Sequence, residues 1–203
     1  MADTIRTQTD LLANLFQDGQ SPGAITAQDI RDLIVSLRAN QGGGWSMHTD
    51  ATYNADDGDN NKLAIADGVR TKLTIDNAGA DTNTTYAPPD GAIWDTGTNT
   101  LLPTITGAAY DLRLTMYASY DSGASAHIDM ELDIGGSIGT IYHVHELFAK
   151  GAGETNEMGW SLPIFTLGTF VANGGTIYIT PEGSNVKIWD IKLMITQTFK
   201  PTT

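Results

Sequence analysis

The chain has 203 residues, of which 40% are hydrophobic and 17% charged, a balance that indicates a packed globular domain with a small additional module and excludes a largely disordered chain. Acidic residues outnumber basic ones 24 to 11, and the net charge is −13. The basic residues are scattered singly, so nucleic acid and anionic membrane surfaces are not expected partners. The lack of cysteine excludes disulfides, thiolate zinc sites and a cysteine nucleophile.

The N-terminus lacks the apolar core of a secretory signal, and no apolar run reaches the ~18 residues of a membrane span. We therefore expect synthesis in a cytoplasm and no membrane insertion.

Residues 7–38 have the pattern of two helices, separated at 18–23 by DGQSPG, whose glycines and proline interrupt a helix. Thr26 is placed to cap the second helix, with Asp29 three residues later reaching back to it. NQGGG at 40–44 ends that helix and supplies a flexible joint. Both helices carry an apolar stripe, formed by Leu11, Leu12, Leu15, Phe16, Ile30, Leu33, Ile34 and Leu37.

From residue 62 onward, short strands alternate with turns rich in Gly, Thr, Asp and Asn. The expected strand segments are 62–77 (two strands about a DG turn), 92–103 (about a TGTN turn), 108–120, 126–136, 138–148, 160–174, 175–183 and 185–199. This spacing predicts a mainly β fold, an antiparallel jelly-roll sandwich preceded by a small N-terminal helical hairpin. The expected parts are a helical anchor module (1–44), a linker (45–61) and a jelly-roll domain (62–203).

Strict alternation predicts which strand side chains enter the core. In 108–120 and 126–136 they are Tyr110, Leu112, Leu114, Met116, Ala118, Ile128, Met130, Leu132 and Ile134. The last segment places apolar residues on both faces: Trp189, Ile191, Leu193 and Ile195 on one, Ile188 and Met194 on the other. Because an antiparallel sheet usually keeps one face in water, two apolar faces suggest a subunit interface.

The N-terminal helical pair is too small to fold alone, since chains below ~40 residues rarely bury enough surface. Burying one large apolar side chain is worth ~1.5–3 kcal/mol, so the stripes need a partner. One alternative is a hairpin packed on its own β domain. The other is an anchor that joins a different chain, which the glycine-rich joint favours.

The segment TQTDLLANLFQDGQSPGAITAQDIRDLIVSL resembles an N-terminal module of tailed-phage fibres, spikes and head appendages. The pieces RTKLTIDN, IWDTGTNTLLPTITGAAYDLRLTMYAS, FVANGGTIYITPEG and VKIWDIKLMITQTF are similar to the trimeric C1q- or TNF-like jelly rolls at the tips of viral fibres. The resemblance implies a homotrimer, attachment through the N-terminus and a β domain that faces outward. This chain lacks the repetitive shaft of long fibres, which favours a short appendage or head decoration.

We therefore expect a structural virion protein of a tailed bacteriophage, made in the bacterial host cytoplasm and bound to the capsid or another virion protein through residues 1–44. The alternative is a tail receptor-binding protein, an adhesin for host-surface glycans. We expect no enzyme and no cofactor, because the chain has no G-x-S-x-G, H-E-x-x-H or P-loop motif. A third alternative is a depolymerising glycosidase. Acidic residues are plentiful enough to supply its two carboxylates, but the sequence shows no distinctive pair.

Two segments resemble metal sites. NADDGDNN at 54–61 fails the EF-hand register, because counting back from Gly58 puts Tyr53 and Ala55 at ligand positions. A looser calcium site from Asp56, Asp57 and Asp59 stays open as an alternative to a polar turn.

YHVHEL at 142–147 places His143 and His145 on one face of a strand. We interpret them as an ordinary pair rather than a metal site, since one copy offers only two ligands. Three copies around a trimer axis would offer six, which fits an octahedral metal.

Aromatic residues at turns are candidates for stacking on glycans. The four candidates are Trp94, Tyr117, Tyr120 and Trp160. Packing in the core or at an interface is the alternative for each tryptophan.

Overall fold

The computed structural model describes residues 26–40, 43–54, 58–88, 93–123 and 125–201. The helices are α2 (Ala27–Asn40), the 3-10 helix η2 (Gly58–Asn61) and α3 (Gly168–Asn173). The strands are β1 (Trp45–Thr49), β2 (Leu63–Ile65), β3 (Thr71–Lys72), β4 (Trp94–Asp95), β5 (Thr100–Leu101), β6 (Ala109–Tyr120), β7 (His127–Asp133), β8 (Thr140–Leu147), β9 (Asn156–Phe165), β10 (Thr176–Glu182) and β11 (Val186–Phe199).

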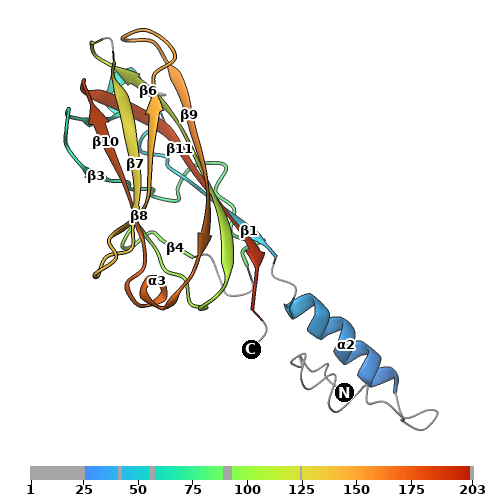
Figure 1. Cartoon of the computed structure of the whole chain (residues 1–203). Helices are drawn as coiled ribbons and strands as arrows, with labels where there is room; N and C mark the ends of the chain where they lie inside the picture. The colour runs from blue at the N-terminus through green and yellow to red at the C-terminus, as the bar shows by residue number, and fades with distance from the viewer. Residues whose placement is uncertain (1–25, 41–42, 55–57, 89–92, 124, 202–203) are drawn as a thin grey trace.

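Two antiparallel sheets form a sandwich (Figure 1). We call the first sheet A, with strand order β1-β11-β6-β9 and β2 also paired to β11, and the second sheet B, with order β3-β10-β7-β8. Sequence neighbours often lie in different sheets, so the chain crosses repeatedly between them. The fold is therefore the antiparallel jelly-roll sandwich that the strand pattern predicted.

The core lies between the inner faces of the two sheets. Alternation in β6 and β7 is confirmed, because every side chain predicted to point inward is buried there. The core also includes Phe170, from α3, and Leu73 and Ile75, from the loop after β3. Burial of this continuous apolar layer holds the two sheets together.

The segment 160–174 is a strand only in its first part. β9 ends at Phe165, and α3 follows and carries the buried Phe170. Gly174 ends this helix with φ 73°, and a Cβ there would lie 2.8 Å from the Leu101 carbonyl oxygen. The single long strand expected for 160–174 is therefore wrong: a short helix closes one end of the sandwich.

The faces expected for the last strand are also wrong in part. Asp190 has φ 51°, and the pairing with β6 shifts between Trp189 and Lys192. This β-bulge inserts one residue, so Ile188 points into the core together with Ile191, while Trp189 lies on the outer face. Lys62 covers the Trp189 ring at 4.2 Å.

The two strands expected about the DG turn both form, but they do not pair with each other. β2 pairs with β11 in sheet A, and β3 pairs with β10 in sheet B. The turn is a corner between sheets, and the Asp67 carboxylate accepts a hydrogen bond there from the Gly183 N–H at 2.8 Å. By contrast, β4 and β5 pair across the TGTN turn as expected.

The second N-terminal helix forms where the sequence predicts it. The Asp29 N–H donates to Thr26 Oγ1 at 3.2 Å, and the Thr26 N–H donates to Asp29 Oδ2 at 2.8 Å. This reciprocal pair is a capping box with aspartate in the usual glutamate position. In Figure 1, α2 lies beyond the end of the sandwich where β1 begins, not along either sheet. No helix in the described ranges is long and apolar enough to span a bilayer.

Candidate functional site

Three of the four histidines in the chain gather on the outer face of sheet B. Strands β7 and β8 pair so that Asp129 lies directly opposite His145, and Glu131 opposite His143. His127 lies two residues before Asp129 on β7 and therefore points to the same face. The alternation of each strand and the register between them bring these side chains together at the edge of the sheet.

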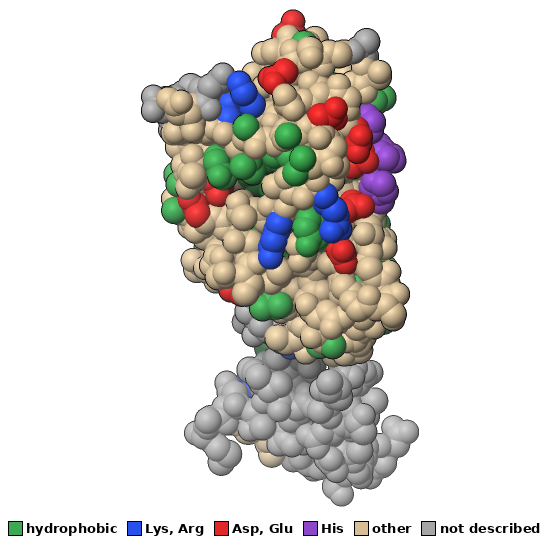
Figure 2. All heavy atoms as spheres, turned by 90° about the vertical axis from the view of Figure 1, so that its left-hand side faces the viewer, with side chains coloured by type: hydrophobic (Ala, Val, Ile, Leu, Met, Phe, Trp, Pro, Cys, Tyr) green, Lys and Arg blue, Asp and Glu red, His purple; other side chains and the backbone are tan. Residues whose placement is uncertain are grey.

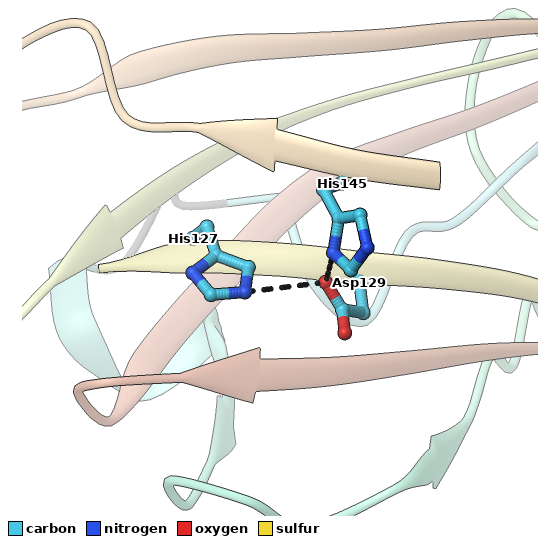
Figure 3. A group of neighbouring side chains, drawn as sticks. All are labelled: His127, Asp129 and His145. Atoms are coloured by element: carbon cyan, nitrogen blue, oxygen red, sulfur yellow. Dashed lines mark hydrogen bonds and ion pairs between the residues drawn. The ribbon is translucent and has the colours of Figure 1, made fainter. Parts of the chain in front are cut away.

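The Asp129 carboxylate is the centre of this cluster, which we call the histidine cluster (His127, Asp129, His143 and His145). Its Oδ1 lies 3.4 Å from His127 Nε2 and also contacts His145 Nδ1, as Figure 3 shows. Its Oδ2 lies 3.2 Å from His143 Nε2. One carboxylate therefore faces three imidazole rings.

Histidine and acidic side chains lie beside one another at the molecular surface in Figure 2. The His145 side chain is 60% exposed, whereas that of Asp129 is 13% exposed. A solvent ion can therefore reach the imidazoles, while the carboxylate lies at the base of the cluster.

The next two acidic residues on β7, Glu131 and Asp133, are paired with an arginine instead of with histidines. Arg70 donates to Glu131 at 2.5 Å and to Asp133 at 3.0 Å, and its guanidinium covers the Tyr178 ring at 3.5 Å. A hydrogen bond from the Gly135 N–H and the Arg70 partner lower the pKa of Asp133. Among the described residues Asp129 has no Lys or Arg partner, so histidines alone surround it.

Sequence reasoning found part of this cluster. His143 and His145 share a face as expected, but one copy offers more than the two ligands predicted, because His127 and Asp129 join them. The missed signal is an H-x-D strand at 127–129 followed by an H-x-H strand at 143–145. A hairpin between them would bring the two patterns together, which required knowing that β7 and β8 pair.

Three of the four candidate glycan-stacking aromatics are buried. Trp94, Tyr120 and Trp160 belong to the core, and the Tyr120 ring lies 4.6 Å from that of Phe148. For Trp94 and Trp160 the alternative of packing in the core is therefore confirmed, and Tyr120 is buried with them, so none of the three offers a ring to a glycan.

Tyr117 is 38% exposed on the outer face of sheet A, with the Trp189 ring at 6.1 Å. It borders a surface hollow of about 370 Å³ that is also lined by Glu157, Asp190 and Lys192. A hydrogen bond from Lys192 to Asp81, at 2.5 Å, raises the pKa of Lys192 and keeps it cationic.

The outer face of sheet A is apolar at the end near α3. Phe165 and Phe199 flank Ala109 on adjacent strands and are 65% and 56% exposed. Leu167 is exposed next to them, and Met194 is half-buried on the same face. Large exposed apolar side chains such as Phe165 and Phe199 are candidates for an interaction surface.

Of the predicted anchor residues, Ile30 and Ile34 are exposed on α2, and Leu33 is half-buried. Leu11, Leu12, Leu15 and Phe16 lie outside the described residues, and so does the side chain of Leu37. The loose calcium site also falls there, because residues 55–57 and the side chain of Asp59 are not described.

The fourth histidine, His48, is buried inside the sandwich. Its Nδ1 lies 3.0 Å from Asn77 Oδ1 and its Nε2 lies 2.9 Å from Ser46 Oγ. Burial lowers the pKa of His48, against the opposing effect of the Asn77 hydrogen bond. His48 is therefore neutral in the folded protein at pH 7.

No protein-family model matches the sequence, and no curated protein matches it. Among the solved structures with a similar fold, three illustrate the similarity. They are Eiger TNF from S. frugiperda (10% identity, TM-score 0.44, covering 80% of this chain and 96% of that one), the PRD1 vertex protein P5 (15%, 0.41, 77% and 96%) and murine APRIL (9%, 0.41, 76% and 98%). At these identities and scores the similarity does not carry function.

Proposed function

We propose that the chain is a structural virion protein of a tailed bacteriophage: a homotrimeric head decoration or short fibre. Residues 1–44 attach it to the capsid or to another virion protein, and the jelly roll projects outward. The proposal includes no catalytic step, no nucleic acid and no membrane insertion.

The observation that carries the proposal is a well-capped amphipathic helix outside the sandwich. Thr26 and Asp29 fix the start of α2, yet Ile30 and Ile34 remain exposed on it. A helix of 14 residues gains little stability from propensity alone and normally depends on packing of its apolar side. Contact with a second protein would bury these side chains.

The joint after α2 supports an attachment that is separate from the sandwich. Gly44 has φ 110°, and a Cβ there would lie 2.8 Å from the Tyr86 carbonyl oxygen. The Trp45 N–H donates to that same carbonyl at 2.6 Å, which fixes the point where the β domain begins. The helical module therefore ends at a position that only glycine fits well.

The trimer is supported by the apolar end of sheet A. Phe165, on the edge strand β9, and Phe199, on the central strand β11, are exposed on either side of Ala109 of β6. Burial of each phenylalanine in an interface is worth ~1.5–3 kcal/mol, repeated in every copy.

The attachment is tested with substitutions that keep the helix. The double variant Ile30→Gln with Ile34→Gln removes the two large apolar side chains that are exposed on the described part of α2, and Arg31→Gln on the same helix is the matched control. Purified full-length proteins are added to particles that lack the protein, and bound protein is quantified. We expect the double variant and a chain lacking residues 1–44 to lose binding while the control retains it. Normal decoration by the chain lacking 1–44 would reject the proposal.

The second candidate function, a tail adhesin for host-surface glycans, is favoured by Tyr117. This exposed ring borders a polar hollow with Glu157 and Lys192, and such a ring can stack on a sugar while the polar groups bind hydroxyls. Glycan arrays probed with wild type, Tyr117→Ala and the control Tyr86→Ala test it. Micromolar binding lost only in Tyr117→Ala would favour the adhesin, and no glycan signal would favour the decoration protein.

A further inference from the structure

We propose that the histidine cluster is a binding site for a divalent transition metal, zinc above all. His127 Nε2, an Asp129 carboxylate oxygen and His145 Nδ1 are the ligands, and His143 orients Asp129. This inference is independent of the virion proposal, because it rests on one chain and one face of sheet B.

The geometry of the three ligand atoms fits a single ion. They all lie within 4.8 Å of one another, and His127 Nε2 is 3.4 Å from Asp129 Oδ1. Two ligands of a tetrahedral zinc ion, each about 2.1 Å from the metal, lie about 3.4 Å apart. The His145 ring has to rotate away from its present contact with Asp129 to admit the ion.

The donor set selects the class of metal. Two imidazole nitrogens and a carboxylate oxygen suit Zn²⁺, Ni²⁺ or Cu²⁺, whereas Ca²⁺ requires six to eight oxygens. Two histidines and one carboxylate are also a ligand set that zinc uses when a fourth position stays open. Here that position faces solvent, because the His145 side chain is 60% exposed.

The surroundings keep Asp129 available for the metal. Arg70 forms ion pairs with Glu131 and Asp133, the carboxylates next to Asp129 on β7, so it does not pair with Asp129 itself. His143 Nε2 lies 3.2 Å from Asp129 Oδ2, which leaves Oδ1 directed between His127 and His145. A partner that orients a ligating carboxylate in this way typically changes metal affinity 10–100-fold.

A bound ion would also join two strands. His127 and Asp129 lie on β7, and His145 lies on β8, which among the described strands pairs only with β7 at the edge of sheet B. A metal between them would therefore stabilise the sheet edge, and it would leave one coordination position for water or for a side chain of another protein.

The test uses the full chain without a polyhistidine tag, treated with a chelator and dialysed. Isothermal titration with ZnCl₂, and the visible absorption of added Co²⁺, report binding and tetrahedral geometry. We expect one Zn²⁺ per chain, an affinity at least ~100-fold weaker in Asp129→Asn and His145→Gln, and a 10–100-fold loss in His143→Gln. Glu157→Gln, which removes one negative charge from sheet A, is the control and should bind as wild type.

Thermal unfolding of the same proteins shows whether Zn²⁺ stabilises the protein through the histidine cluster or through a general effect on the chain. Zn²⁺ should raise the Tm of wild type and Glu157→Gln, but not that of Asp129→Asn. Circular dichroism confirms that each variant is folded. The proposal is overturned if wild type binds no Zn²⁺, or if Asp129→Asn and His145→Gln bind it with wild-type affinity.

Discussion

Among single residues, buried His48 couples the stability of the sandwich to pH. Its pKa in the folded protein is lowered below 6.5 by burial, so the unfolded chain binds more protons between the folded pKa and 6.5. Stability therefore rises with pH in this window: the contribution is fully present above pH 6.5 and is lost as pH falls through the folded pKa.

The variant His48→Gln should remove this contribution, because glutamine still offers polar atoms to Asn77 and Ser46 but does not titrate. Urea unfolding at about pH 7.5 and about pH 5.5, on either side of the ordinary pKa of histidine, measures the effect. Wild type should lose more stability between the two pH values than His48→Gln. Equal losses would show that His48 does not couple stability to pH.

The sequence predicted individual site residues only in part. The H-x-H alternation placed His143 and His145 on one face, since this depends on strand geometry alone. Asp129 and His127 became part of the cluster through the register of β7 on β8, which pairs Asp129 with His145. Register is a property of two strands together, so no single strand pattern contains it.

At the level of elements, the bulge in β11 is the feature that simple alternation misses. Asp190 holds φ 51°, and its N–H donates to the Tyr53 carbonyl at 2.7 Å. Aspartate and asparagine tolerate this left-handed conformation better than branched residues do. The bulge allows Ile188 and Ile191 to share the core face although they are three residues apart.

This conformation predicts a clear ranking of substitutions. Asp190→Asn should change the free energy of unfolding little, whereas Asp190→Val should lower it by about 1–2 kcal/mol, because the branched valine has no short polar group to offset the cost of the left-handed conformation. Chemical denaturation of both variants checks the ranking. Equal stability of the valine and asparagine variants would contradict it.

Elements were predictable where one periodicity runs through the whole segment. β6 and β7 alternate without interruption, so both their existence and their buried faces followed from the sequence. The segment 160–174 contains two elements, and its apolar residues alone did not distinguish the end of β9 from the start of α3. The capping box at Thr26 was predictable because capping is local.

At the scale of the whole molecule, the apolar patch on sheet A predicts the assembly. The double variant Phe165→Ser with Phe199→Ser removes the two large exposed rings from this face of sheet A. Without them the trimer should dissociate. The matched control is Val69→Ser with Ile138→Ser, which removes two exposed apolar side chains elsewhere. Light scattering coupled to size-exclusion chromatography should find monomers for the first variant and trimers for wild type and control. A wild-type monomer would reject the homotrimer.

The two ends of the molecule have different roles in this account. In the function that we propose, residues 1–44 attach the chain and the sandwich projects outward, with the histidine cluster on sheet B and Phe165 and Phe199 on sheet A. The net charge of −13 is compatible with the solvent-facing position that we propose for the sandwich.

Electron cryo-microscopy of the intact particle would show where the chain is attached and which end of it faces outward. We expect a three-fold jelly-roll density that projects from the particle, with helical density from residues 1–44 seated on a capsid or neighbouring virion protein. Particles that lack this density, or that hold the chain through its sandwich with residues 1–44 directed outward, would contradict it.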